Sequence, residues 1–142
     1  MSGISITNET TVLNDISSGI GSYTVNISYN GTSYTTTAHV GVQIDYTNSA
    51  GKYVNFPDDN FRALIEIYDT DRNGEDNGFL TKAELEAVDG AMHLGGADGA
   101  PHNIKDVTGI EYFTKLTIFY GQYGVLEGTL DLSNNTLLTE VS

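Results

Sequence analysis

The sequence predicts an α+β protein that begins with an antiparallel β-sheet, continues with two short helices around an acidic loop, and ends in a short repeat. Three observations support this fold class. Residues 4–45 are rich in Thr, Ser, Val, Ile and Tyr, which favour strands. The apolar period becomes helical between residues 56 and 88. The pattern of apolar positions over residues 110–119 returns over residues 132–141.

The composition excludes several classes of function. The chain has 142 residues, which is the size of one average domain or two small ones. Its net charge of -13 disfavours nucleic acid and anionic lipid and favours cations. The absence of Cys excludes a thiol nucleophile, a zinc-thiolate site and disulfides. No apolar run reaches the ~20 residues of a membrane-spanning helix, and no signal peptide is visible. We expect no nucleic-acid partner and no membrane insertion.

The clearest β element is a hairpin. Apolar and polar residues alternate over Ser22–Tyr29, and Asn30 and Gly31 then suit the two positive φ angles of a type I′ turn. A two-residue turn determines the register of the strands that it joins. The expected cross-strand pairs are Tyr23 with Ala38, Val25 with Thr36, and Ile27 with Tyr34.

Weaker strands are expected at Ile4–Ile6 and Thr11–Leu13, so the N-terminal sheet has four strands at most. The run Gly21–Gly31 resembles the closing hairpin of bacterial immunoglobulin-like surface domains. This resemblance implies that residues 1–48 are an incomplete immunoglobulin-like segment with a β-sandwich-like sheet, because a whole sandwich needs about 100 residues. Its open edges would allow a homo-oligomer.

Two short helices are expected next. The first carries one apolar stripe at helical spacing and begins near Pro57, with Asp58 and Asp59 favouring its positive N-terminal dipole. The second begins at Thr81, where Thr81 and Glu84 form a capping box. The residues of the stripe are Phe61, Leu64, Ile65 and Tyr68. The Gly- and Ala-rich residues 90–102 are expected to form a loop.

The acidic loop between the helices predicts a calcium site of the EF-hand type. Alternate oxygen ligands, a turn glycine and a closing bidentate Glu characterise such loops. In the first register, Gly74 is the turn glycine and Phe79 supplies a backbone carbonyl. This register spans sixteen residues instead of twelve, so it requires an insertion. Its ligands are Asp69, Asp71, Asn73, Phe79 and Glu84.

A second register restores the twelve-residue spacing. It has Gly78 as the turn glycine and ligands at Asn73, Glu75, Asn77 and Glu84. We favour the first register because its two Asp residues bring more negative charge to the ion. The alternative to both is a solvated acidic turn that binds no metal.

No arrangement of residues predicts catalysis. The three histidines, His39, His93 and His102, are scattered, and no Ser lies in a nucleophile elbow. We therefore expect a protein that is not an enzyme.

The C-terminal repeat is short but regular. The run Thr114–Thr117 returns as Thr136–Thr139, and the same shift carries Phe119 onto Val141. A period of 20–29 residues with Leu-type positions is typical of leucine-rich repeats. The run Leu130–Asn135 is similar to a turn of that family.

Taken with the helix pair, these runs resemble the N-terminal cap of bacterial leucine-rich-repeat surface proteins. The resemblance rests on residues 54–62, 68–71, 80–85, 109–117 and 130–136. It implies an EF-hand-like helical cap at residues 49–106 and the start of a leucine-rich-repeat solenoid at residues 107–142. It also implies an extracellular or cell-surface location, bound calcium, and repeats that bind protein or glycan ligands.

A second hypothesis belongs to a different class. An incomplete β segment can accept or donate a strand, as subunits of filaments and virions do. The chain would then be an assembly subunit that uses β-strand complementation.

Overall fold

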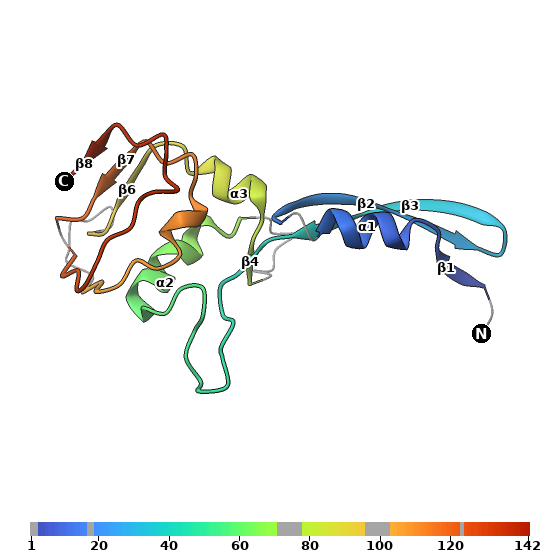
Figure 1. Ribbon diagram of the computed structural model, residues 1–142, viewed down its shortest axis with the longest axis horizontal. Coiled ribbons are helices and arrows are strands. Elements are labelled where there is room, and N and C mark those ends of the chain that lie inside the picture. The colour runs from blue at the N-terminus through green and yellow to red at the C-terminus, as the bar shows by residue number, and fades with distance from the viewer. Residues whose placement is uncertain (1–2, 17–18, 71–77, 96–102, 123) are drawn as a thin grey trace. The chain divides into compact units, whose positions relative to one another are not determined.

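The chain forms two compact units, residues 1–42 and residues 43–142. The structure is a computed structural model that describes residues 3–16, 19–70, 78–95, 103–122 and 124–142 (Figure 1). No helix within these ranges is long and apolar enough to cross a membrane.

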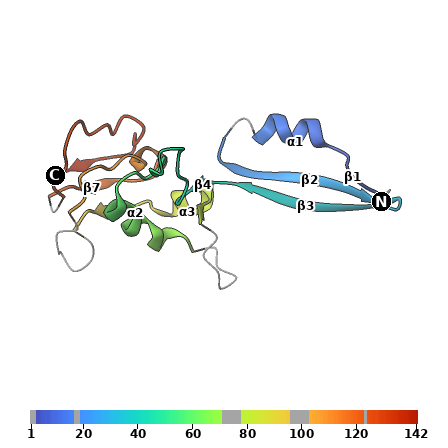
Figure 2. The same cartoon turned by 90° about the horizontal axis from the view of Figure 1, so that it is seen from below.

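The first unit is a three-stranded antiparallel sheet with one helix. The strands follow the order β1–β2–β3, with β1 at Ile4–Ile6, β2 at Gly21–Tyr29 and β3 at Thr32–Val40. The helix α1, Glu9–Ile16, connects β1 to β2 and lies against one face of the sheet (Figures 1 and 2). Among the described side chains of β1, α1, β2 and β3, only that of Val12 is buried, with 7% exposed.

The predicted hairpin is confirmed in its register and turn. The pairs Tyr23 with Ala38, Val25 with Thr36, and Ile27 with Tyr34 all occur. Asn30 has φ +49° and Gly31 has φ +77°, as a type I′ turn requires. Local sequence was sufficient here because the turn determines the register without help from other elements.

The strand expected at Thr11–Leu13 is wrong, because these residues lie inside α1. Val12 and Ile16 stand at a helical spacing in the sequence, which competes with the β preference of the threonines. The side chain of Asn8 decides which pattern forms. Its amide donates to the carbonyl of Thr24 and accepts from the N–H of Asn26, which ends the pairing of β1 with β2 just before the helix.

The second unit begins within β4, Val42–Gln43, which pairs with β5, Phe79–Leu80. Helix α2, Asp59–Ile65, continues as a 3₁₀ turn, η1, over Glu66–Tyr68, so the predicted apolar stripe is wound more tightly at its end. Helix α3, Lys82–Ala87, starts at Thr81 with the predicted capping box.

Three short strands form a parallel sheet in the order β6–β7–β8. They are β6 at Ala91–His93, β7 at Ile118–Tyr120 and β8 at Glu140–Val141, and a second 3₁₀ turn, η2, lies at Ile110–Tyr112. The loop expected over residues 90–102 is therefore wrong at its start. Because β6 is short and contains Ala, only its pairing with β7, which is distant in the chain, reveals it.

The predicted interval of the repeat is confirmed by the pairing of Phe119 with Val141. The same interval relates the turns between the strands. The N–H groups of Phe113 and Leu116 donate to the carbonyls of Ile110 and Phe113. The N–H groups of Asn135 and Leu138 donate in the same way to the carbonyls of Leu132 and Asn135. Each such turn, together with the strand that follows it, is called a coil of the repeat below. The buried side chain of Asn135 donates back to the carbonyls of Ile110 and Phe113 at 2.8 and 3.0 Å, which fastens the two coils together.

The second unit has a continuous apolar core drawn from its helices, strands and loops. Its largest fully buried side chains are Ile44, Phe56, Phe61, Ile65, Leu80, Met92, Leu94, Ile104, Ile110, Phe113, Leu116 and Phe119.

Candidate functional site

The loop between η1 and α3 has a buried carboxylate at each end. Asp69 follows η1 and is 2% exposed, and Glu84 in the first turn of α3 is 6% exposed. Acidic side chains are seldom buried to this extent, because removing their charge from water is costly unless partners offset it. The predicted calcium ligands at the two ends of the loop, Asp69 and Glu84, therefore require partners that stabilise their buried charges.

The carboxylate of Glu84 joins both ends of the loop. One oxygen, Oε2, accepts from the N–H and hydroxyl of Thr81 at 2.9 and 2.8 Å, which completes the capping box. The other, Oε1, accepts from the N–H of Thr70 at 2.5 Å and from its hydroxyl at 3.4 Å. Because Thr70 directly follows Asp69, these bonds bring the start of the loop against the start of α3.

Asp69 organises the other side of the loop. Its Oδ2 accepts from the N–H of Gly78 at 3.2 Å, and Gly78 has φ +73°. Asp69 is the first ligand in one predicted register, and Gly78 is the turn glycine in the other. The hydrogen bond thus joins one residue from each of the two registers.

Phe79, the predicted donor of a backbone carbonyl, lies in β5 directly after Gly78, with its side chain 43% exposed. The carbonyl of Gly78 accepts from the N–H of Ile44 at 3.0 Å. The strand pairing of β4 with β5 therefore holds the end of the loop in place.

The remaining predicted ligands, Asp71, Asn73, Glu75 and Asn77, lie outside the described residues. Within the described ranges, no group of three or more Asp, Glu or His side chains is arranged to hold a metal ion. The described part of the loop supplies two buried carboxylates, Asp69 and Glu84, and every calcium ligand remains a prediction.

Asp58 has a structural role that the sequence did not predict. The sequence indicated only that its negative charge favours the positive N-terminal dipole of the first helix. Its Oδ1 accepts from the N–H groups of Asn60 and Phe61 and caps α2, and its Oδ2 accepts from those of Lys105 and Asp106. Burial opposes its charge, but these four backbone N–H groups together lower the pKa of Asp58 below its ordinary value of 3.8. Asp58 therefore ties α2 to the segment that leads into the repeat.

Replacing Asp58 with Asn should destabilise the second unit by about 2 kcal/mol, because the amide presents a donor to backbone donors. A carboxylate with a lowered folded pKa stabilises above its unfolded pKa and loses that contribution as the pH falls through the folded value. The variant should accordingly lose stability at neutral pH and show less change on acidification. Urea unfolding at several pH values measures both effects. Asp59→Asn is the matched control, since exposed Asp59 makes a surface ion pair with Arg62. Equal losses in the two variants would contradict the role of Asp58.

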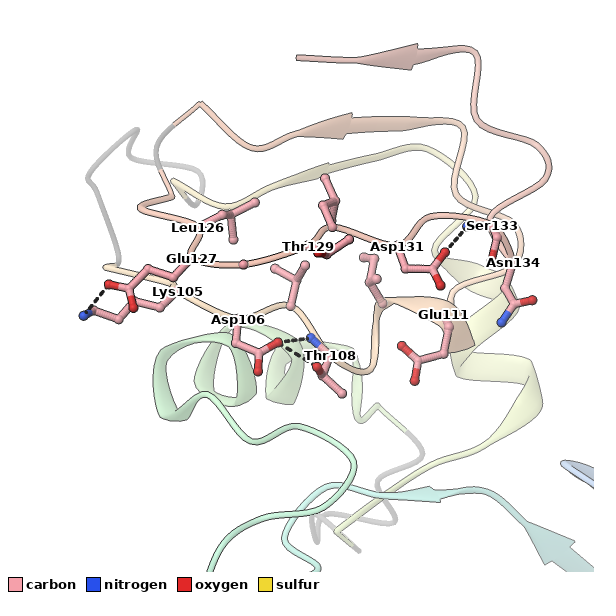
Figure 3. Close-up of a pocket in the computed structure, with 14 residues that line it drawn as sticks. Lys105, Asp106, Thr108, Glu111, Leu126, Glu127, Thr129, Asp131, Ser133 and Asn134 are labelled. Atoms are coloured by element: carbon pink, nitrogen blue, oxygen red, sulfur yellow. Dashed lines mark hydrogen bonds and ion pairs between the residues drawn. The ribbon is translucent and has the colours of Figure 1, made fainter.

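A groove of about 310 Å³ lies between the two successive coils of the repeat (Figure 3). Residues 105–108, 110 and 111 line one side, and residues 126–131, 133 and 134 line the other. The two sides are bonded to each other by residues that lie one repeat interval apart. The N–H of Glu127 donates to the carbonyl of Lys105 at 2.8 Å, and the side chains of these two residues form an ion pair. This groove has no counterpart among the predicted sites, because it exists only when the coils stack.

The groove is acidic and its carboxylates are oriented by local bonds. Asp106 accepts from the N–H and hydroxyl of Thr108, and Glu111 accepts from the N–H of Gly109. Asp131 accepts from the N–H of Ser133, which lowers its pKa. Carboxylates held in this way suit a ligand that donates hydrogen bonds.

The two described histidines, His39 and His93, lie in different units. The ring of His93 packs against that of Tyr120 with centroids 4.6 Å apart and the ring planes tilted by 43°, and His39 shares a hydrogen bond with Ser22 in the first unit. His102 lies outside the described residues.

No protein-family model matches the sequence, and no curated protein matches it. Among solved structures, an internalin from Listeria monocytogenes is similar, with 19% sequence identity and a TM-score of 0.47. The match covers 71% of this chain and 25% of the internalin chain, so this chain spans about a quarter of that protein's length. A likeness this distant assigns neither a family nor an activity.

Proposed function

We propose that the chain is a non-enzymatic structural and interaction module of an extracellular bacterial surface protein. In this proposal, residues 49–106 are a calcium-binding helical cap, and residues 107–142 begin a leucine-rich-repeat array that binds protein or glycan ligands. The observation that carries the proposal is the pair of buried carboxylates, Asp69 and Glu84, at the two ends of one acidic loop.

Calcium fits the chemistry of these side chains. Hard oxygen ligands closely spaced in an acidic loop are what Ca²⁺ prefers, and a loop that ends in a Glu at the start of a helix suits a bidentate closing ligand. The ligands that we propose are Asp69, Asp71, Asn73, the carbonyl of Phe79, and Glu84. The ion would offset the repulsion between carboxylates and would fasten α2 to α3.

The parallel strands support the proposal of a repeat array. Val141 in β8 is 53% exposed, whereas Phe119, its counterpart one coil earlier, is 1% exposed. Val141 is thus suited to contact with a further strand of the same kind. Stacked coils of this kind share one core, and their exposed loops and strands supply binding surfaces.

Calcium titration of the metal-free chain tests the metal part of the proposal. At 100 times the dissociation constant, calcium should stabilise the fold by about 2.7 kcal/mol, and chelator should reverse the gain. For a unit of this size this corresponds to a rise in melting temperature of about 10 °C. Magnesium at equal concentration is the control, since it demands a smaller octahedral site. A melting temperature that neither calcium nor chelator changes would reject the calcium site.

A further inference from the structure

The outer edge of β3 is a long strand edge that no described strand covers. β3 is nine residues long and lies at the end of the order β1–β2–β3 (Figure 1). Seven of its nine residues are exposed, all except Ala38 and Val40. Protein edges are normally protected by charged side chains, by proline or by bulges, and β3 contains no Lys, Arg, Asp, Glu or Pro. The strand pairs with β2 without interruption along its whole length.

The hairpin determines which backbone groups point outward. The residue pair that closes a two-residue turn exchanges two hydrogen bonds, and the pattern then alternates along an antiparallel ladder. Tyr29 and Thr32 close the turn, so the even-numbered residues of β3 bond to β2. On the other side of β2, both backbone groups of Asn26 bond toward the β1 side, as this alternation requires. The outward N–H and C=O groups therefore belong to Ser33, Thr35, Thr37 and His39.

We propose that this edge pairs with the same edge of a second copy of the chain. An antiparallel pairing centred on Thr36 sets Thr35 opposite Thr37 and Ser33 opposite His39. Both pairs then consist of outward-pointing residues, so each can exchange two backbone hydrogen bonds. The register uses the whole strand and obeys two-fold symmetry, as a closed dimer interface must.

The side chains suit this self-pairing. Thr36 meets Thr36 of the second copy, and Tyr34, which is 52% exposed, meets Ala38 of the second copy on the same face. Threonine pairs and aromatic residues across strands stabilise antiparallel sheets. Because β3 carries no acidic or basic side chain other than His39, which faces Ser33, the register places no like charges opposite one another.

The small core of the first unit favours a second copy over an isolated edge. Among the described side chains of its four elements, only that of Val12 is buried. Folded units of about 40 residues usually need disulfides, a metal or oligomerisation to be stable. The chain has no Cys, and no metal-holding group occurs among the described residues. Joining two sheets would double the continuous ladder and cover the β3 edge of each copy.

Analytical ultracentrifugation of the full chain, with and without chelator, tests the dimer. We expect a reversible monomer–dimer equilibrium that tightens with salt, because a net charge of -13 on each copy opposes association at low ionic strength. A chain that stays monomeric at high concentration and high salt would overturn the proposal. Because the measurement does not depend on calcium, its failure is distinguishable from failure of the calcium site.

The variant Thr35→Pro examines the register directly. Proline removes an N–H that points outward and leaves the ladder to β2 intact, so only the dimer should suffer. Each dimer loses two backbone hydrogen bonds, and we expect its dissociation constant to rise at least about tenfold. An unchanged constant would overturn the proposed edge.

A second pair of variants separates dissociation from misfolding. Thr37→Lys places a charge on the edge strand, and Thr24→Lys places the same charge at the directly opposite position of central strand β2. Only Thr37→Lys should abolish the dimer. Hydrogen exchange gives the readout by residue. The amides of Thr35 and Thr37 should be protected in the dimer alone, and those of Tyr34 and Thr36 in both states. A dimer that leaves Thr35 and Thr37 unprotected would show a different interface and overturn the proposal.

Discussion

Replacing Gly109 with Ala should destabilise the second unit by about 4 kcal/mol or more, from overpacking and backbone strain together. Gly109 has φ +107°, a conformation that side chains rarely adopt. A Cβ atom there would lie 2.2 Å from Cδ1 of Phe56 and 2.6 Å from the backbone oxygen of Asn55. Phe56 is fully buried, so its ring has nowhere to move without opening the core.

Gly128→Ala is the matched control for this variant. Gly128 has φ +88°, and its added Cβ would meet nothing within 4 Å. It should cost only the strain of the left-handed conformation, about 1–2 kcal/mol. Denaturant unfolding of both variants gives the two free energies, and their difference measures the close packing at Phe56. Equal losses would contradict the contact between Gly109 and Phe56.

Glu84→Gln should destabilise the metal-free second unit by about 3 kcal/mol. The carboxylate accepts from the N–H and hydroxyl groups of both Thr70 and Thr81. A glutamine replaces one acceptor oxygen with a donor, which then faces other donors at a site that is 6% exposed. The same variant should abolish the rise in melting temperature with calcium, because Glu84 is the closing ligand in both predicted registers.

The variant Glu86→Gln provides the comparison, since it removes the same charge from the same helix. Glu86 pairs with Lys82, four residues earlier on α3, and a surface pair of this kind is worth little. Chelator separates the two roles of Glu84. If Glu84→Gln unfolds no more readily than Glu86→Gln in chelator, the hydrogen-bond network around Glu84 does not stabilise the unit. If it keeps the calcium response, Glu84 is not a ligand.

Several elements could be predicted because neighbouring residues alone determine them. The hairpin follows from Asn30 and Gly31, and the start of α3 follows from Thr81 and Glu84 three residues later. The pairing of Phe119 with Val141 follows from a repeat that is visible in the sequence. In each case the physical cause acts over a few residues or returns at a constant interval.

Other elements depend on partners that are far away in the chain. Helix α1 forms in place of a predicted strand because Asn8 bonds to the backbone of β2 and ends the pairing of β1. Strand β6 falls within a predicted loop because its partner β7 is distant in the sequence. The double role of Asp58 depends on Lys105 and Asp106, which are 47 and 48 residues away.

The candidate site shows the same division. The types of the acidic residues and their spacing predicted a cation loop bounded by Asp69 and Glu84, because hard cations need oxygen ligands at short intervals. That Asp69 bonds to Gly78, and that Glu84 bonds to Thr70 across the loop, depends on how η1, β5 and α3 pack.

The sequence by itself determined the acidic charge, the hairpin register, the capping box and the step of the repeat, since each follows from local stereochemistry or composition. Only the tertiary structure decided the burial of Asp69 and Glu84, the groove in the repeat, and the edge of β3 that no described strand covers. Burial and exposure depend on which distant segments pack together. The free energy of that packing comes from the core as a whole and not from any single stretch of the sequence.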